Sequence, residues 1–149
     1  MIGGADPSIN GMVPADIEIR RNYFFKPPAW YASNQWSVKN ALELKIGKRV
    51  MIEGNIMENN WVDAQTGFSI VFKSVNQSGS APWSETSDVM FRNNIIVDAP
   101  NAISMSGKPE QYPAIRMSRI AVVNNLMYKI GPSGSFGGAA RGFQFSSDM

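Results

Sequence analysis

Few side chains in this 149-residue chain could carry out chemistry, because it contains no cysteine and no histidine. Their absence excludes thiol nucleophiles, disulfides, zinc sites built from those residues and a histidine general base. Lys45 and Lys73 each end a short apolar stretch, ALELK and FSIVFK, and could stand one above the other. Such a pair could contact an acidic sugar or abstract a proton from it, although two solvated surface lysines are the alternative.

Four tryptophans lie in polar stretches between apolar segments, where their rings could stack on sugar rings. An aspartate and a glutamine follow one of them and could bond sugar hydroxyls. The alternative is that these side chains fold over the flank of the protein and shield it. The candidate sugar-binding residues of these stretches are Trp30, Trp36, Trp61, Asp63, Gln65 and Trp83.

The elements that must position these residues repeat along the chain. Four similar segments, DIEIRRN, RVMIEGN, DVMFRNN and RIAVVNN, end at Asn22, Asn55, Asn94 and Asn125. In each segment two apolar residues stand two places apart, which predicts a strand with one buried face. Two apolar residues follow each asparagine and predict a second short strand.

A third strand precedes the later copies of the segment, in ALELK, FSIVFK, AISMS and, towards the chain end, GFQFSS. Each unit is too short to bury a face alone, so the units must stack to share a core. The expected inward residues of the third strands are Leu42, Leu44, Ile70, Phe72, Ile103, Met105, Phe143 and Phe145. We also expect a short helix within residues 33–41.

The asparagine column has a structural explanation. Asparagine tolerates the left-handed backbone conformation, and its amide can bond nearby backbone and the asparagine of the next unit. We therefore expect the column to form a ladder at a turn rather than a catalytic signature.

The pattern V-x-I-x-x-N-x-I/M after an L-x-L strand resembles right-handed parallel β-helix proteins of the pectate-lyase type. The stretches PADIEIRRNYFFKP and VKNALELKIGKRVMIEGNIMENNWVDAQTGFSIVF also resemble uncharacterised exported bacterial β-helix proteins. The resemblance implies an all-β, right-handed parallel β-helix (solenoid) of about four coils. It would form one segment over residues 1–149 and be an uncapped fragment of a longer domain.

The same resemblance implies carbohydrate binding or polysaccharide processing, and an extracellular or cell-surface location. Any enzyme would be a polysaccharide lyase or a glycoside hydrolase. However, the adjacent aspartates and Gly-His-Gly segment of the superfamily's galacturonases are absent. The alternatives are a non-catalytic structural or adhesive surface solenoid and an inactive fragment of a larger β-helix.

Composition limits the partners. Fourteen lysines and arginines against twelve acidic residues give too small a basic excess to indicate nucleic acid binding. No stretch approaches the roughly 20 apolar residues of a membrane span. We expect no cofactor and no metal, a possible polysaccharide ligand, and self-association through uncapped coil ends.

Overall fold

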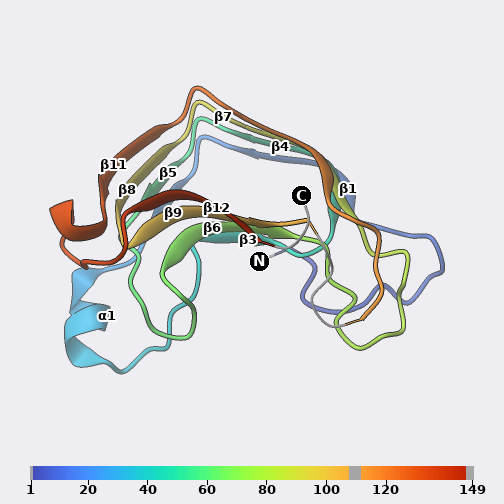
Figure 1. Ribbon diagram of the computed structural model, residues 1–149, viewed down its shortest axis with the longest axis horizontal. Coiled ribbons are helices and arrows are strands. Elements are labelled where there is room, and N and C mark those ends of the chain that lie inside the picture. The colour runs from blue at the N-terminus through green and yellow to red at the C-terminus, as the bar shows by residue number, and fades with distance from the viewer. Residues whose placement is uncertain (1, 108–111, 147–149) are drawn as a thin grey trace.

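Three parallel sheets of four strands form the framework of the computed structural model, which describes residues 2–107 and 112–146 (Figure 1). The first contains β1 (Ala15–Arg20), β4 (Gly47–Glu53), β7 (Thr86–Arg92) and β10 (Ser118–Val123). The second contains β2 (Tyr23–Phe25), β5 (Ile56–Glu58), β8 (Ile95–Ala99) and β11 (Leu126–Ile130). The third contains β3 (Leu42–Leu44), β6 (Phe68–Lys73), β9 (Asn101–Ser106) and β12 (Arg141–Ser146).

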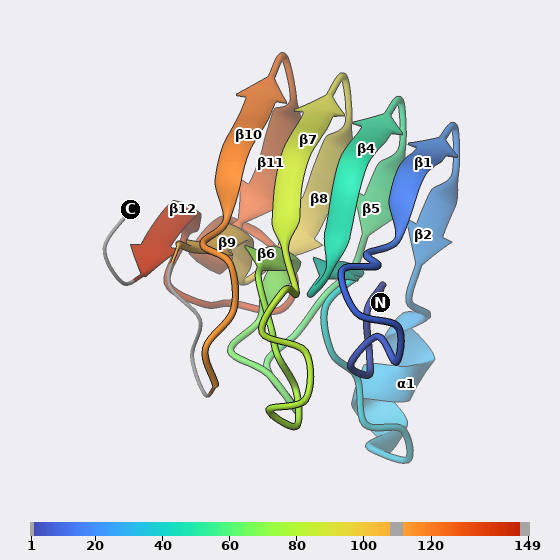
Figure 2. The ribbon, with the colours of Figure 1, turned by 90° about the vertical axis from the view of Figure 1, so that its right-hand side faces the viewer.

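Neighbours within each sheet are every third strand along the chain, so each repeat adds one strand to each sheet (Figure 2). This arrangement is compatible with a parallel β-helix and confirms the prediction of stacked parallel strands. In one column of the first sheet Ile19 pairs with Ile52, and Ile52 pairs with Phe91. Like residues therefore lie on like, about 4.7–4.9 Å apart, as the repeat predicts.

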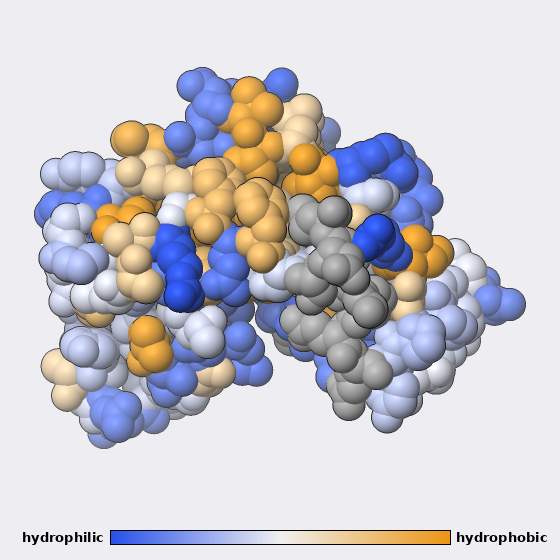
Figure 3. All heavy atoms as spheres, viewed as in Figure 1, coloured by the Kyte–Doolittle hydropathy of each residue, from blue (hydrophilic) through white to orange (hydrophobic). Residues whose placement is uncertain are grey.

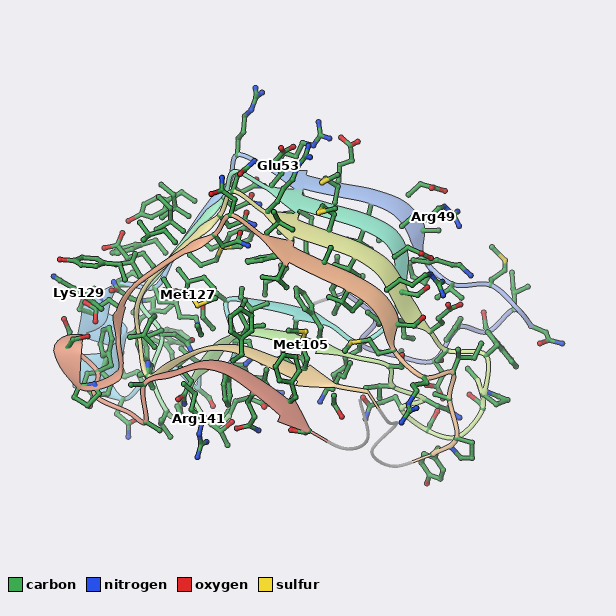
Figure 4. All side chains as sticks on the ribbon, turned by 45° about the horizontal axis from the view of Figure 1, so that its top comes forward. Arg49, Glu53, Met105, Met127, Lys129 and Arg141 are labelled. Carbon is green, nitrogen blue, oxygen red and sulfur yellow. The ribbon has the colours of Figure 1, made fainter. Side chains whose placement is uncertain are left out.

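The core lies between the three sheets. Ile52, Phe72 and Phe91 are fully buried there, and the rings of Phe72 and Phe91 meet edge to face with centroids 5.8 Å apart. Met105 and Met127 point into this interior in Figure 4. Stacking thus supplies the burial that a single three-strand unit lacks.

The described residues contain two short helical elements, α1 (Pro28–Ser33) and a 3-10 turn, η1 (Gly131–Ser133). The prediction of a helix within residues 33–41 was wrong, because residues 34–41 contain none. The helix starts at Pro28, whose fixed φ suits a first helical position. It ends at Asn34, which has a φ of 50° and donates its backbone N–H to the Trp30 carbonyl at 3.1 Å.

The four asparagines form a hydrogen-bonded ladder at the turn between the first and second sheets. The Nδ2 of Asn22, Asn55 and Asn94 donates to the Oδ1 of the next asparagine at 3.0, 2.9 and 3.0 Å. The left-handed conformation does not fall on these residues. It falls on the residue before each, since the positive φ values are at Arg21, Gly54, Asn93 and Asn124. The ladder asparagines therefore serve through their side chains.

An ion-pair column runs along the start of the first sheet. Arg49 Nε lies 2.6 Å from Asp16 Oδ1, and Arg119 Nε lies 2.5 Å from Asp88 Oδ1. The hydrogen bond from Arg119 lowers the pKa of Asp88 to about 2, against a smaller opposing effect of desolvation. Acidic and basic side chains alternate along this column, so the charged side chain of each strand attracts that of the neighbouring strand.

Inward-facing apolar side chains of β12 are exposed. Phe143 and Phe145 are 45% and 60% exposed and line a cavity of about 580 Å³ together with Ile120 and Val122. Apolar atoms gather at the centre of the face in Figure 3. Self-association through such surfaces stays a prediction.

Candidate functional site

Two groups of loops project beyond the outer face of the sheet β3-β6-β9-β12 (Figure 1). We call residues 26–41, 59–67 and 134–140 the α1 wall. We call residues 3–14, 74–85 and 112–117 the opposite wall. The outline of the molecule is notched between the two groups below the sheet (Figure 3). We call this sheet face, which lies between the two groups of loops, the floor; two of its outward residues, Glu43 and Ser69, are buried.

The floor carries the two lysines that the sequence singled out. Leu44 pairs with Phe72, so Lys45 and Lys73, which follow them, occupy neighbouring rungs. Lys73 Nζ lies 3.6 Å from Glu43 Oε1, an ion pair whose side chains are only 15% and 5% exposed. That oxygen of Glu43 accepts no hydrogen bond. The first role of Lys73 is thus to neutralise a buried carboxylate.

Lys45 is better placed to meet a ligand. It lies at the edge of the floor, beside the opposite wall, and is half-buried. Its Nζ donates to Gln77 Oε1 at 2.9 Å. An ammonium bonded to a neutral amide keeps its full charge, so this position attracts an anionic group.

The α1 wall is built around a cluster of three rings. Trp61 is only 3% exposed and packs against Tyr31 and Phe136, with centroids 5.5 and 5.3 Å away. Lys26 Nζ lies 5.9 Å from the Trp61 ring and donates to the Lys39 carbonyl and to Asn60 Oδ1. Burial lowers the pKa of Lys26 to about 8. Trp61 therefore shields the flank in this structure and presents no free face for stacking.

The other predicted residues of this wall lie nearer the solvent. Trp30 and Trp36 are 40% and 60% exposed. Asp63 accepts a hydrogen bond from the Val38 backbone at 2.7 Å, which ties two loops of the wall together, and Gln65 is half-buried. The structure groups these four with Trp61 on one wall, apart from Trp83.

Trp83 belongs to the opposite wall and lines a cavity of about 430 Å³. Its Nε1 is buried and has no hydrogen-bond partner. Lys48 and Glu85 lie in the same lining, paired at 3.0 Å. Desolvation raises the pKa of Glu85, but hydrogen bonds from Ser87 and Lys48 and nearby positive charge outweigh it, so this pKa lies below its ordinary value. An indole ring beside a carboxylate and an ammonium is suited to a sugar.

One feature of the opposite wall was not predicted from the sequence. The carboxylate of Asp6 is held by the loop at residues 77–80, more than seventy residues away. The loop supplies three backbone N–H groups and two hydroxyls to it. The serine and glycine residues of QSGS indicate a turn. The sequence does not indicate that Asp6 binds there.

Within residues 2–107 and 112–146 no cluster of three or more acidic, histidine or cysteine side chains is placed to hold a metal ion. None of the helices in that part of the chain has the length and apolarity to cross a membrane. Comparisons with protein-family models, curated proteins and solved structures find no match for this chain. The function must therefore be inferred from the residues of the chain itself.

Proposed function

We propose that this protein binds a polysaccharide that carries acidic groups, on the outer face of the sheet β3-β6-β9-β12. The observation that carries the proposal is the position of Lys45 on the floor, beside Lys73 and against the opposite wall. A second support is Trp83, which lines a cavity on that wall next to Lys48. Lys45 offers an ammonium for an acid group, and Trp83 offers a ring for a sugar face in a separate cavity whose lining includes Lys48 and Arg49 of β4.

The two lysines have different parts in this proposal. Lys45 contacts the ligand, because only a neutral amide occupies its ammonium among the hydrogen bonds of the described residues. Lys73 positions and neutralises Glu43 at the floor. Removing Lys73 would leave Glu43 buried without its counter-ion, at a cost of about 3–5 kcal/mol. Substitution of Lys45 is therefore the cleaner test of binding.

The finer points of the fold belong to the same proposal. We infer a right-handed sense for the coils and membership of the pectate-lyase-type superfamily, with an extracellular or cell-surface location. The repeat with its asparagine ladder supports the fold assignment. The handedness and the location rest on the sequence resemblance alone.

A glycan array tests the proposal, with wild-type protein beside Lys45→Ala and Trp83→Ala. We expect wild type to bind acidic glycans and each variant to lose at least about tenfold in affinity, since each deletes one contact. Lys129→Ala is the matched control, because it removes one exposed lysine from the second sheet. A wild-type protein that binds no acidic glycan sinks the proposal.

A structural or adhesive role without catalysis is the second candidate, and one observation favours it. The outer face of β2-β5-β8-β11 exposes Tyr23, Leu126 and Tyr128 at 56–58%, with Phe25 at 44%. Exposed apolar patches of this kind mark contact surfaces. This candidate predicts no ultraviolet-absorbing product from pectin or alginate, and a steady release of such product would exclude it.

A further inference from the structure

The loop at residues 77–80 is organised around an anion. Asp6 Oδ2 accepts from Ser78 N at 2.9 Å, Ser78 Oγ at 2.6 Å, Ser80 N at 3.2 Å and Ser80 Oγ at 2.9 Å, and Oδ1 accepts from Gln77 N. Convergent backbone N–H groups of this kind form anion-binding concavities. Three N–H groups and two hydroxyls aimed at one carboxylate are more than a surface turn needs.

The shape of the loop is fixed by contacts other than Asp6. Asn76 is only 2% exposed, accepts from Ala81 N at 3.0 Å and donates to the Pro113 carbonyl at 2.8 Å. It therefore braces both ends of the loop from below. Gly79 has a φ of +89°, which suits glycine, and a Cβ there would lie 3.1 Å from the Tyr112 ring. Because the loop is braced independently, its donors would stay aimed at the same point if Asp6 moved away.

Asp6 belongs to a segment with little strand pairing. Gly3 and Gly4 precede it, and among the described residues of this segment the strand pairing is limited to the isolated bridge between Ile2 and Leu44. Asp6 is itself half-buried, so the position it fills is reachable from solvent. Desolvation raises its pKa, but the hydrogen bonds from Ser78, Gln77 and Ser80 outweigh this, so its pKa lies well below the ordinary range.

We infer that the 77–80 loop is an anion-binding site, which Asp6 fills as an internal substitute for the carboxylate or sulfate group of an acidic polysaccharide. The ligand class rests on the proposed function, whereas the anion site itself does not. Lys45 connects the anion site with the floor, because its ammonium donates a hydrogen bond to the side chain of Gln77 at the edge of the loop. An acid group that displaces Asp6 would therefore lie next to the positive charge on the floor.

Rescue by small anions tests the site without any glycan. Asp6→Ala should melt below wild type, and 50 mM sulfate or acetate should raise its melting temperature by about 3 °C more than that of wild type. Chloride at equal ionic strength should not raise the melting temperature of Asp6→Ala more than that of wild type. The triple variant Asp6→Ala/Ser78→Ala/Ser80→Ala is the control, because it has the same charge but lacks two donors. Equal anion effects in all three proteins would overturn the inference and leave the proposed function intact.

Affinity electrophoresis identifies the source of the anion. Gels contain polygalacturonate, dextran sulfate or neutral dextran, and run Asp6→Ala, the triple variant and wild type side by side. Asp6→Ala should be retarded at least about threefold more than the triple variant in one acidic polymer, since it offers an open site. Polygalacturonate alone points to a uronate, and dextran sulfate alone to a sulfate ester. Equal retardation of the two variants in both acidic polymers, or retardation by neutral dextran to the same extent, overturns the assignment to an acidic glycan.

Discussion

Replacement of Asn94 by alanine should be among the most destabilising single changes in the ladder. Its Oδ1 accepts from the Asn55 backbone N–H and from Asn55 Nδ2, both at 2.9 Å. Its Nδ2 donates to the Ile52 carbonyl and to Asn125 Oδ1, both at 3.0 Å. Asn94 is only 1% exposed, so water cannot replace these partners without opening the turn.

The magnitude follows from the groups left unpaired. Each buried polar group without a partner costs about 1–3 kcal/mol, and Asn94→Ala leaves at least two such backbone groups. We therefore expect a loss of roughly 4 kcal/mol in the free energy of unfolding. Asn22→Ala is the matched comparison at the edge of the ladder. Its side chain makes two hydrogen bonds, one of them exposed, so its loss should be about 1 kcal/mol.

Urea unfolding followed by circular dichroism measures both variants. At a slope of about 2 kcal/mol/M, a 3 kcal/mol difference separates the two midpoints by about 1.5 M. Asn94→Asp should be no better than Asn94→Ala, because it keeps the acceptor but loses the donor and buries a charge. If Asn94→Ala unfolds within about 0.5 M of Asn22→Ala, the ladder does not contribute as its buried hydrogen bonds indicate.

Three further predictions concern other parts of the fold. The Asp88 carboxylate has a lowered pKa, so its pairing with Arg119 stabilises the protein above about pH 4, and this stabilisation is lost towards pH 2. The difference in melting temperature between wild type and Arg119→Met should therefore shrink as the pH falls over that range. A difference that stays constant would refute this prediction. Trp61→Ala should lower the free energy of unfolding by about 3–5 kcal/mol, because the Trp61 ring is buried in its cluster. Trp36→Ala should lower it by less than about 0.5 kcal/mol, because Trp36 is exposed. Equal losses for the two variants in urea unfolding would contradict this prediction. Phe145→Ser should reduce concentration-dependent association in sedimentation velocity because it removes an exposed apolar ring, and unchanged association would place the contact elsewhere.

The repeat made most of the fold predictable. Apolar residues two apart, at constant offsets from each asparagine, indicated the strands, their inward faces and their stacking. The structure pairs Ile17 with Val50 and Val50 with Val89, in the register that the alignment of the segments implies. Such prediction works because every repeat buries the same positions against the next.

Features that depend on a single residue's neighbours were not predictable in the same way. The left-handed turn conformation falls on Arg21, Gly54, Asn93 and Asn124, where glycine and asparagine occupy three of the four positions. The prediction placed it on the ladder asparagines, one residue later, because asparagine also tolerates that conformation. The alternation of Asp16, Arg49, Asp88 and Arg119 is present in the sequence, at the same position of each repeat. The ion pairs become evident once both charges are read together.

The loops were the least predictable, because they differ between repeats and their contacts are long-range. Trp61 looked like an exposed sugar platform, yet Tyr31 and Phe136 cover it. Asp6 reaches the loop at residues 77–80 only because the coil brings the two segments together. Periodicity gives no information about contacts of this kind.

Binding of acidic glycan through Lys45 is the central claim, and affinity electrophoresis of wild type beside Lys45→Ala in polygalacturonate, dextran sulfate and neutral dextran tests it most directly. We expect retardation of wild type in an acidic polymer, little in neutral dextran, and most of the retardation lost in Lys45→Ala but retained in Lys129→Ala. Equal retardation of wild type and Lys45→Ala in both acidic polymers, each measured against its own mobility in a gel without polymer, would contradict the account.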